Sequence, residues 1–122
     1  MRRSFRVMSV AVSVLAIVGA LGFSTAVIAG DKKKEMSGKE LAFNKKKGNC
    51  LACHLIAGGD QAGNIAPPLI AMKARFPDKA VLRAQIVDPH ANNPDSMMPP
   101  FKAHGILSDK EIDLIVDFVY GL

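Results

Sequence analysis

The most specific chemistry in the sequence is carried by Cys50 and Cys53, the only two cysteines of the 122-residue chain, and by the histidine after them. The segment reads Cys50-Leu51-Ala52-Cys53-His54, and a Cys-x-x-Cys-His run is the attachment motif of c-type haem. Residues three apart lie on the same side of a helical turn, so both thiols can reach the two vinyl groups along one porphyrin edge. We therefore predict one covalent haem c, with His54 as an axial ligand of its iron.

Three other uses of the cysteines fit the sequence less well. A zinc site needs four ligands, and the remaining histidines, His90 and His104, lie far from Cys53 in the sequence. A thioredoxin-like redox pair expects a βαβ context, which the sequence does not predict. A plain disulfide is compatible with export but leaves His54 without a role. Haem attachment uses all three residues.

A second axial ligand is expected from Met97-Met98-Pro99-Pro100-Phe101. Electron-carrying haems often use a methionine, whose sulfur raises the reduction potential. We predict Met98 rather than Met97, because Met98 adjoins the prolines, which stiffen the chain beside it. The alternatives are Met97, His90 and His104. A methionine here could also simply fill the core.

The stretch Ala66-Pro67-Pro68-Leu69 is a candidate support for His54. An iron-bound histidine normally donates its second ring N–H to a carbonyl or carboxylate, which fixes the orientation of the ring. The loop after the haem motif places the carbonyl of Pro67 within reach of that role. We therefore predict a hydrogen bond from His54 to Pro67.

The first 29 residues have the pattern of a secretory signal peptide. Arg2, Arg3 and Arg6 precede an uncharged apolar run, and small residues lead to a cleavage position after Ala29. The run is also long enough for an uncleaved membrane anchor, which is the alternative. The rest of the chain is nearly balanced in charge, which does not favour nucleic-acid binding. We predict a signal peptide at 1–29, export to the periplasm and a charged tail at 30–36.

The remaining residues, 37–122, predict one all-α domain of short helices and loops around the haem. Ser37-Gly38-Lys39-Glu40 is a capping box, so a helix begins there and is expected to end near Lys47-Gly48. A second short helix is expected over Leu69–Arg75, with Met72 as a packing residue. A third is expected to start at Pro77-Asp78.

The C-terminal helix is the clearest prediction. A second capping box, Ser108-Asp109-Lys110-Glu111, precedes an apolar stripe at helical spacing. The members of that stripe are Ile112, Ile115, Val116 and Val119. Before this helix, Pro89, Pro94, Pro99 and Pro100 oppose regular structure from about residue 88 to 103.

Taken together, these motifs resemble class I cytochromes c, and more closely the SoxX family of small haem subunits. The resemblance covers nearly all of the chain after Lys45. It is carried by five stretches and the C-terminal helix. The stretches are Gly48–His54, Gly63–Leu69, Arg75–Asp78, Leu82–Ile86 and Met97–Phe101.

The SoxX resemblance implies a function that the composition does not. SoxX pairs with SoxA, and the SoxAX complex joins thiosulfate to a cysteine of the carrier complex SoxYZ, an L-cysteine S-thiosulfotransferase reaction. The catalytic cysteine belongs to SoxA, and SoxX passes the electrons to an acceptor cytochrome c. The resemblance thus implies an electron-transfer subunit, with no catalytic residue on this chain.

A free-standing electron carrier is the alternative function. Such a carrier usually surrounds its haem edge with a docking charge, and Lys45-Lys46-Lys47 beside the motif could supply one. Cations at a helix end are also expected simply from the helix dipole. An obligate subunit should instead expose apolar side chains, for which Leu55, Ile56 and Phe101 are the candidates.

Overall fold

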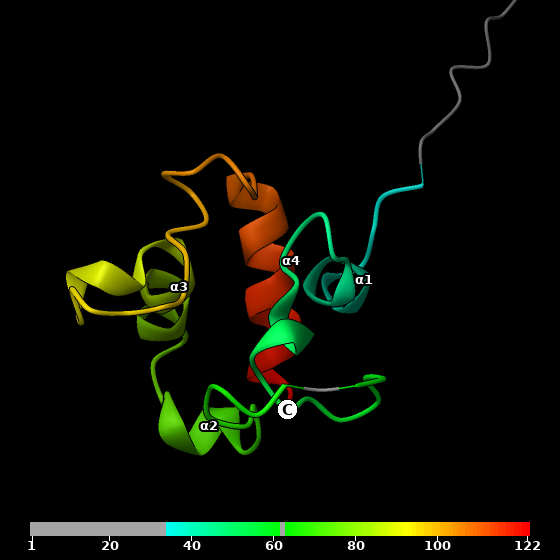
Figure 1. Cartoon of the computed structure of the whole chain (residues 1–122), viewed down its shortest axis with the longest axis horizontal. Coiled ribbons are helices and arrows are strands. Elements are labelled where there is room, and N and C mark those ends of the chain that lie inside the picture. Colours follow the sequence, from blue (N-terminus) through cyan, green and yellow to red (C-terminus); the bar gives the residue numbers. More distant parts are fainter. Residues whose placement is uncertain (1–33, 62) are drawn as a thin grey trace, which may run out of the picture. The chain divides into compact units, whose positions relative to one another are not determined.

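The computed structural model describes residues 34–61 and 63–122. The predicted signal peptide and the first residues of the charged tail lie outside the described residues. The described part contains helices and turns without a strand, which confirms the all-α prediction. Its elements are α1 (Gly38–Phe43), η1 (Cys50–Ala52), α2 (Met72–Arg75), α3 (Lys79–Val87), η2 (Pro89–Ala91) and α4 (Asp109–Tyr120), the two η elements being 3₁₀ turns (Figure 1).

Helix α1 begins with the predicted capping box. The Ser37 hydroxyl accepts from the Glu40 amide, and the Glu40 carboxylate accepts from the Ser37 amide at 2.7 Å. The helix ends at Phe43, so the prediction of an end near Lys47-Gly48 was wrong. Asn44 adopts an extended conformation with ψ 119°, and its side chain accepts from the Lys46 amide at 2.8 Å. The side chain thus offers the backbone a turn in place of another helical turn.

Helix α4 lies between α1 and α3 (Figure 1). Its capping box forms as predicted, and the whole predicted stripe is buried, from Ile112 to Val119. Helix α1 approaches α4 so closely that a Cβ built on Gly38 would lie 1.9 Å from the Leu114 carbonyl oxygen. Phe43 and Phe118 meet edge to face across the same contact, with ring centroids 5.9 Å apart.

Helix α2 is shorter than the predicted Leu69–Arg75. It begins only at Met72, because Ala71 adopts a left-handed conformation with φ 49°. Met72 is 1% exposed, which confirms its packing role. Helix α3 starts after Asp78, whose side chain accepts from the Ala80 amide at 2.8 Å. This N-cap agrees with the start predicted at Pro77-Asp78.

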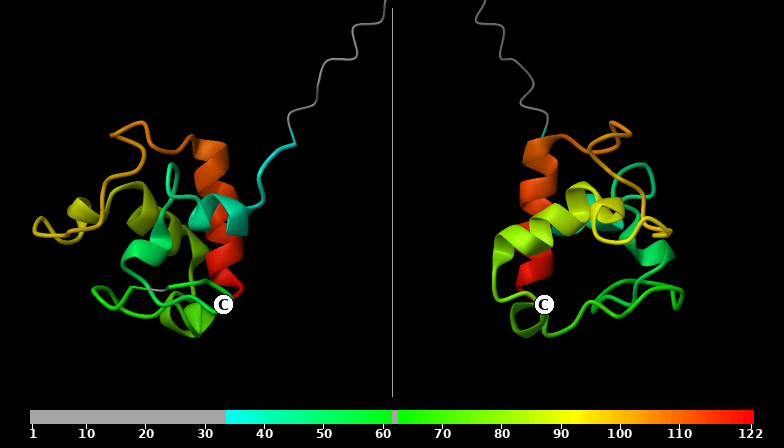
Figure 2. Two further views of the ribbon diagram at one scale, coloured as in Figure 1. Left: turned by 45° about the vertical axis from the view of Figure 1, so that its right-hand side comes forward. Right: turned by 90° about the vertical axis from the view of Figure 1, so that its left-hand side faces the viewer.

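The loop from α3 to α4 is the yellow and orange segment of Figure 2, which runs along one side and leads to the start of α4. The prediction of no regular structure over 88–103 was wrong at one place, the 3₁₀ turn η2. Pro89 occupies its first position, where a missing N–H is tolerated, and the Asp88 side chain caps the turn. Across the described residues, no helix is both long and apolar enough to cross a membrane.

Candidate functional site

An apolar cavity of about 240 Å³ lies against the motif that contains both cysteines. Its lining comes from η1, from α2, α3 and α4, and from each of the segments that connect α1, η1, α2, α3 and α4. The lining residues are Gly48, Asn49, Cys50, Cys53, His54, Pro67, Leu69, Met72, Arg75, Phe76, Leu82, Gln85, Ile86, Met98, Pro99, Phe101, Leu107, Ile115 and Val119. Segments far apart in the sequence therefore line one apolar cavity, which is partly open to solvent.

The 3₁₀ turn η1 presents both cysteines to this cavity. Asn49 adopts a left-handed conformation with φ 49° just before the turn. The His54 amide donates to the Cys50 carbonyl at 2.9 Å, so the turn carries directly into the histidine. Both thiols are free rather than joined in a disulfide. Burial raises the pKa of the Cys50 thiol to about 11, so this thiol is neutral at ordinary pH.

The His54 ring is oriented by the contact that the sequence predicted. Its Nδ1 lies 2.7 Å from the carbonyl oxygen of Pro67. A carbonyl oxygen only accepts, so Nδ1 carries the hydrogen and donates it. The neutral ring then keeps its lone pair on Nε2, which is the atom available to a metal.

The Met97-Met98 pair is divided between the surface and the cavity. Met98 lines the cavity and packs against the core, whereas Met97 is 83% exposed. Among the described residues, neither His90 nor His104 lines the cavity. The arrangement favours Met98 as the sulfur ligand, in line with the sequence prediction, and ligation itself stays a prediction.

Three polar lining residues, Asn49, Arg75 and Gln85, were missed by sequence reasoning. Arg75 lies at the cavity margin and donates from Nη1 to the Pro68 carbonyl at 2.8 Å. Gln85 lies on α3, three residues after Leu82, and so shares its cavity face. For Gln85, the signal available in the sequence was its helical spacing from Leu82. For Arg75, it was the position directly before Phe76-Pro77.

The residue set fits haem c and does not fit zinc. Haem needs two thiols, an imidazole and a large apolar surface, all of which surround this cavity. Within residues 34–61 and 63–122, the structure gathers no group of three or more Cys, His, Asp or Glu side chains that could hold a metal ion. A Cys50–Cys53 zinc site therefore lacks its further ligands here.

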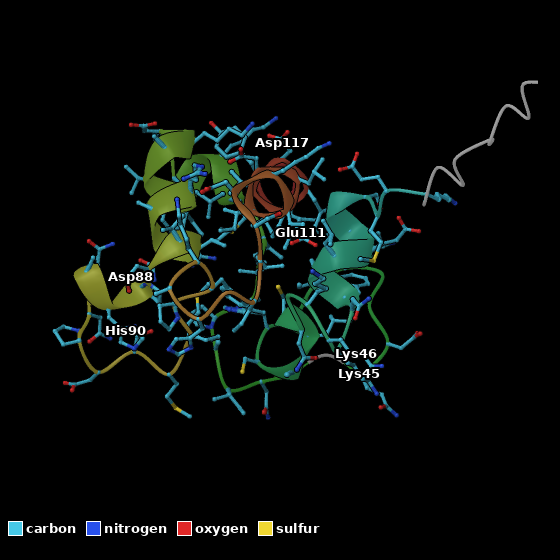
Figure 3. All side chains as sticks on the ribbon, turned by 90° about the horizontal axis from the view of Figure 1, so that it is seen from above. Lys45, Lys46, Asp88, His90, Glu111 and Asp117 are labelled. Atoms are coloured by element: carbon cyan, nitrogen blue, oxygen red, sulfur yellow. The ribbon has the colours of Figure 1, made fainter. Side chains whose placement is uncertain are left out.

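The exposure of the residues beside the cavity separates the predicted docking candidates. Leu55 is 54% exposed, but Ile56 and Phe101 are buried, so those two were wrong as surface candidates. Lys45 and Lys46 are exposed and lie together at one edge of the molecule (Figure 3). Lys47 instead pairs with Glu111 of α4 at 2.7 Å, so only two of the three lysines are available for docking.

Comparison with known proteins places the cavity in a family context. The family model described as Cytochrome c matches residues 36–122. An "Uncharacterized lipoprotein" of Aquifex aeolicus (strain VF5) is 37% identical over 79 residues, which cover 62% of this chain. The chain spans only 37% of that relative's own length. The family match includes every residue that lines the cavity.

Proposed function

The chain belongs to the cytochrome c family, and from that premise we propose that it is the small haem subunit of a SoxAX-type sulfur-oxidising complex in the periplasm. Membership makes it a haem-based electron carrier with covalent haem c and an all-α class I fold. The SoxX-type role goes further and is our proposal. It is supported by the sequence resemblance and by exposed apolar side chains near His54.

When bound, haem c supplies one-electron redox chemistry at its iron. The chain's own residues hold and orient it. Cys50 and Cys53 would form the two thioether bonds, and His54 would present Nε2 to the iron while Nδ1 donates to Pro67. Met98, which lines the cavity wall, would supply a second ligand to the iron. With haem bound, the apolar lining would limit the access of water to the iron.

The observation that carries the proposal is a convergence of three SoxX-like stretches. Gly48–His54, Gly63–Leu69 and Met97–Phe101 each contribute residues to the same cavity. The individual motifs occur in many cytochromes, but the combination resembles the SoxX family. The export pattern at 1–29 supports a periplasmic location, since haem c is attached after export.

The proposed reaction leaves electron transfer as this chain's part. Thiosulfate and a carrier thiol combine to form a Cys–S–S–SO₃⁻ group, releasing one proton and two electrons. The S–S bond to the carrier cysteine forms on the partner subunit, which supplies the catalytic cysteine. Both cysteines here line the haem cavity, so neither is placed as a second nucleophile. The chain would accept the electrons one at a time and pass them to an acceptor cytochrome c.

Exposed apolar side chains next to His54 favour a subunit over a free carrier. The Ala66 amide donates to the Cys53 carbonyl, and the Leu69 amide donates to the Leu55 carbonyl, at 3.0 and 2.9 Å. Two segments of chain are thereby joined side by side, and together they expose Leu55, Ile65 and Ile70 by 54%, 65% and 56%. We call these three residues the apolar edge. Its composition suits a lasting protein contact rather than a transient charged one.

Native purification tests the proposed assembly. From cells oxidising thiosulfate, the periplasmic chain should copurify with a larger haem protein, detected by haem staining of the separated subunits. Leu55→Asp should disrupt this association, because it places a charge in the apolar contact. Recovery of the chain alone, from cells that contain the larger protein, would argue for the free carrier.

The free carrier is the second candidate, and the exposed Lys45 and Lys46 favour it. A transient partner that docks on these lysines should bind more weakly as salt rises. The matched variant Lys45→Glu/Lys46→Glu therefore tests docking on the lysines, whereas Leu55→Asp tests the apolar edge. The lysine variant should slow electron transfer from an acidic redox partner if the chain is a free carrier, and leave subunit copurification intact if the apolar edge is the interface.

A further inference from the structure

The loop between α3 and α4 contains a connected set of polar groups that ends at Met98. The His90 amide donates to the Asp88 side chain at 3.0 Å, directly after α3 ends. The His90 ring contacts the Ser96 carbonyl through Nε2 at 3.0 Å. The Met98 amide then donates to the Ser96 hydroxyl at 3.2 Å. These contacts link the end of a helix to the backbone of the predicted iron ligand.

The direction of the central hydrogen bond follows from its acceptor. The Ser96 carbonyl oxygen only accepts, so His90 Nε2 must carry the hydrogen. His90 Nδ1 faces an Asp88 carboxylate oxygen at 3.4 Å. The preceding Pro89 is among the fully buried side chains, which fixes the backbone from which the ring projects. Figure 3 shows Asp88 and His90 together at one edge of the molecule.

Among the described residues, 97–99 form no backbone–backbone hydrogen bond, and the next one along the chain joins the Pro100 carbonyl to the His104 amide at 3.0 Å. Pro94, Pro99 and Pro100 have no N–H to donate. Met97 is 83% exposed, so the residue before Met98 contributes little packing. The Ser96 amide donates to Asn93, which keeps its contact inside the same loop. The His90 ring therefore provides the side-chain contact that joins Ser96 to the start of this loop.

We propose that His90 is a positioning residue for Met98, acting through Ser96 to hold the sulfur toward the haem iron. His90 itself does not reach the cavity. The inference rests on Met98 being the sixth ligand, but not on the SoxAX-type role. Loss of the His90 contact should increase the fraction of time that Met98 is away from the iron.

Imidazole added to the oxidised, haem-loaded protein measures this fraction, because it can bind the iron only when Met98 leaves. His90→Ala should raise the apparent imidazole affinity about three- to tenfold, the factor expected for one net hydrogen bond. His90→Gln has an amide that can donate to the same carbonyl, and it should recover most of the loss. His104→Ala, an exposed histidine of the same loop, is the matched control and should change nothing.

Two further variants separate the ways in which the inference can fail. Ser96→Ala removes the acceptor of the Met98 amide and should also raise imidazole affinity. Unchanged affinity in His90→Ala, whatever Ser96→Ala does, or an equal rise in His104→Ala, overturns the positioning role. Met98→Ala tests the ligand assignment independently. If it leaves the iron spectrum unchanged, the assignment itself is wrong, whatever the His90 variants do.

Discussion

The two sides of the haem cavity are built in different ways. On the His54 side, the amides of residues 66 and 69 donate to the carbonyls of Cys53 and Leu55, and the His54 ring is hydrogen-bonded to the Pro67 carbonyl at 2.7 Å. On the Met98 side, the amide of Met98 donates to a side chain, the hydroxyl of Ser96, at 3.2 Å. One ligand thus sits in a closely bonded segment next to two covalent attachments. The other depends on prolines and side-chain contacts across a loop.

This contrast separates two properties of the site. The His54 side should decide whether haem is retained, because its attachment is covalent. The Met98 side should decide how the iron behaves, because its ligand can leave without loss of the haem. Variants on the two sides are therefore expected to produce different defects.

Removal of both cysteines should give the largest effect. Cys50→Ser/Cys53→Ser should abolish covalent haem, since no thioether bond can form, while each single change should reduce retention. Mass spectrometry of the exported protein measures the added haem mass. A wild-type mass equal to the bare polypeptide, from cells with working attachment machinery, would remove the basis of the His54-side assignment.

The methionine pair tests the other side of the cavity. Met98→Ala should abolish the weak far-red charge-transfer band of the oxidised protein. It should also lower the reduction potential by on the order of 0.1 V, within the range that axial ligands span. Met97→Ala is the matched control. It removes an 83% exposed side chain, so the band and the potential should stay unchanged. Exchange of the two outcomes would make Met97 the ligand.

The contrast also explains which features could be predicted from the sequence. Cys50, Cys53 and His54 are adjacent in the chain, so their shared role follows from local spacing. The buried stripe of α4 likewise follows from helical periodicity. The choice of Met98 over Met97 could not be made from local spacing, because the path of the loop decides which of the two side chains lines the cavity. The burial of Ile56 and Phe101 depends on the same tertiary path and was missed.

The early end of α1 and the role of Gly38 were also outside the reach of local patterns. The end at Phe43 reflects a turn made by Asn44 rather than a break in helix propensity. Gly38 belongs to a recognisable capping box, but nothing in that motif predicts its contact with Leu114. Both features arise from the need to pack α1 on α4 and return the chain to Cys50.

Gly38→Ala tests the helix pair that supports the His54 side. The new methyl group would lie 1.9 Å from the Leu114 carbonyl oxygen, so α1 must shift from α4. We expect a loss of about 3 kcal/mol in the free energy of unfolding, at the upper end of ordinary overpacking. Denaturant unfolding of the haem-loaded protein measures it. The far-red band should persist under native conditions, because the Met98 loop is not touched.

Gly105→Ala is the matched glycine on the loop between α3 and α4. Gly105 has φ 63°, but a Cβ there would meet no atom within 4 Å. Only the strain of a left-handed alanine remains, about 1 kcal/mol. A loss as large as that of Gly38→Ala would contradict the view that close α1–α4 packing sets the larger effect.

The smallest effect concerns the Lys47–Glu111 pair, which ties the chain before Cys50 to α4 at 2.7 Å. The pKa of Glu111 lies below its ordinary value near 4.5, first because of the hydrogen bond from Lys47 and then because of the Ser108 amide. The unfolded state therefore binds more protons as the pH falls. The pair's stabilisation is fully present above about pH 4.5 and is lost as the pH drops through the lowered pKa.

Lys47→Ala isolates that pair, because it leaves the capping box between Ser108 and Glu111 in place. We expect it to cost about 0.5 kcal/mol near neutral pH, the usual scale for a surface ion pair, here between two partly exposed side chains. The difference from wild type should shrink toward zero as the pH falls through the lowered pKa of Glu111, which urea unfolding at a series of pH values measures. Lys46→Ala, an exposed neighbour, should leave stability unchanged at every pH. A Lys47→Ala loss that is the same at every pH would mean that packing of the lysine stem, and not its charge, joins this segment to α4.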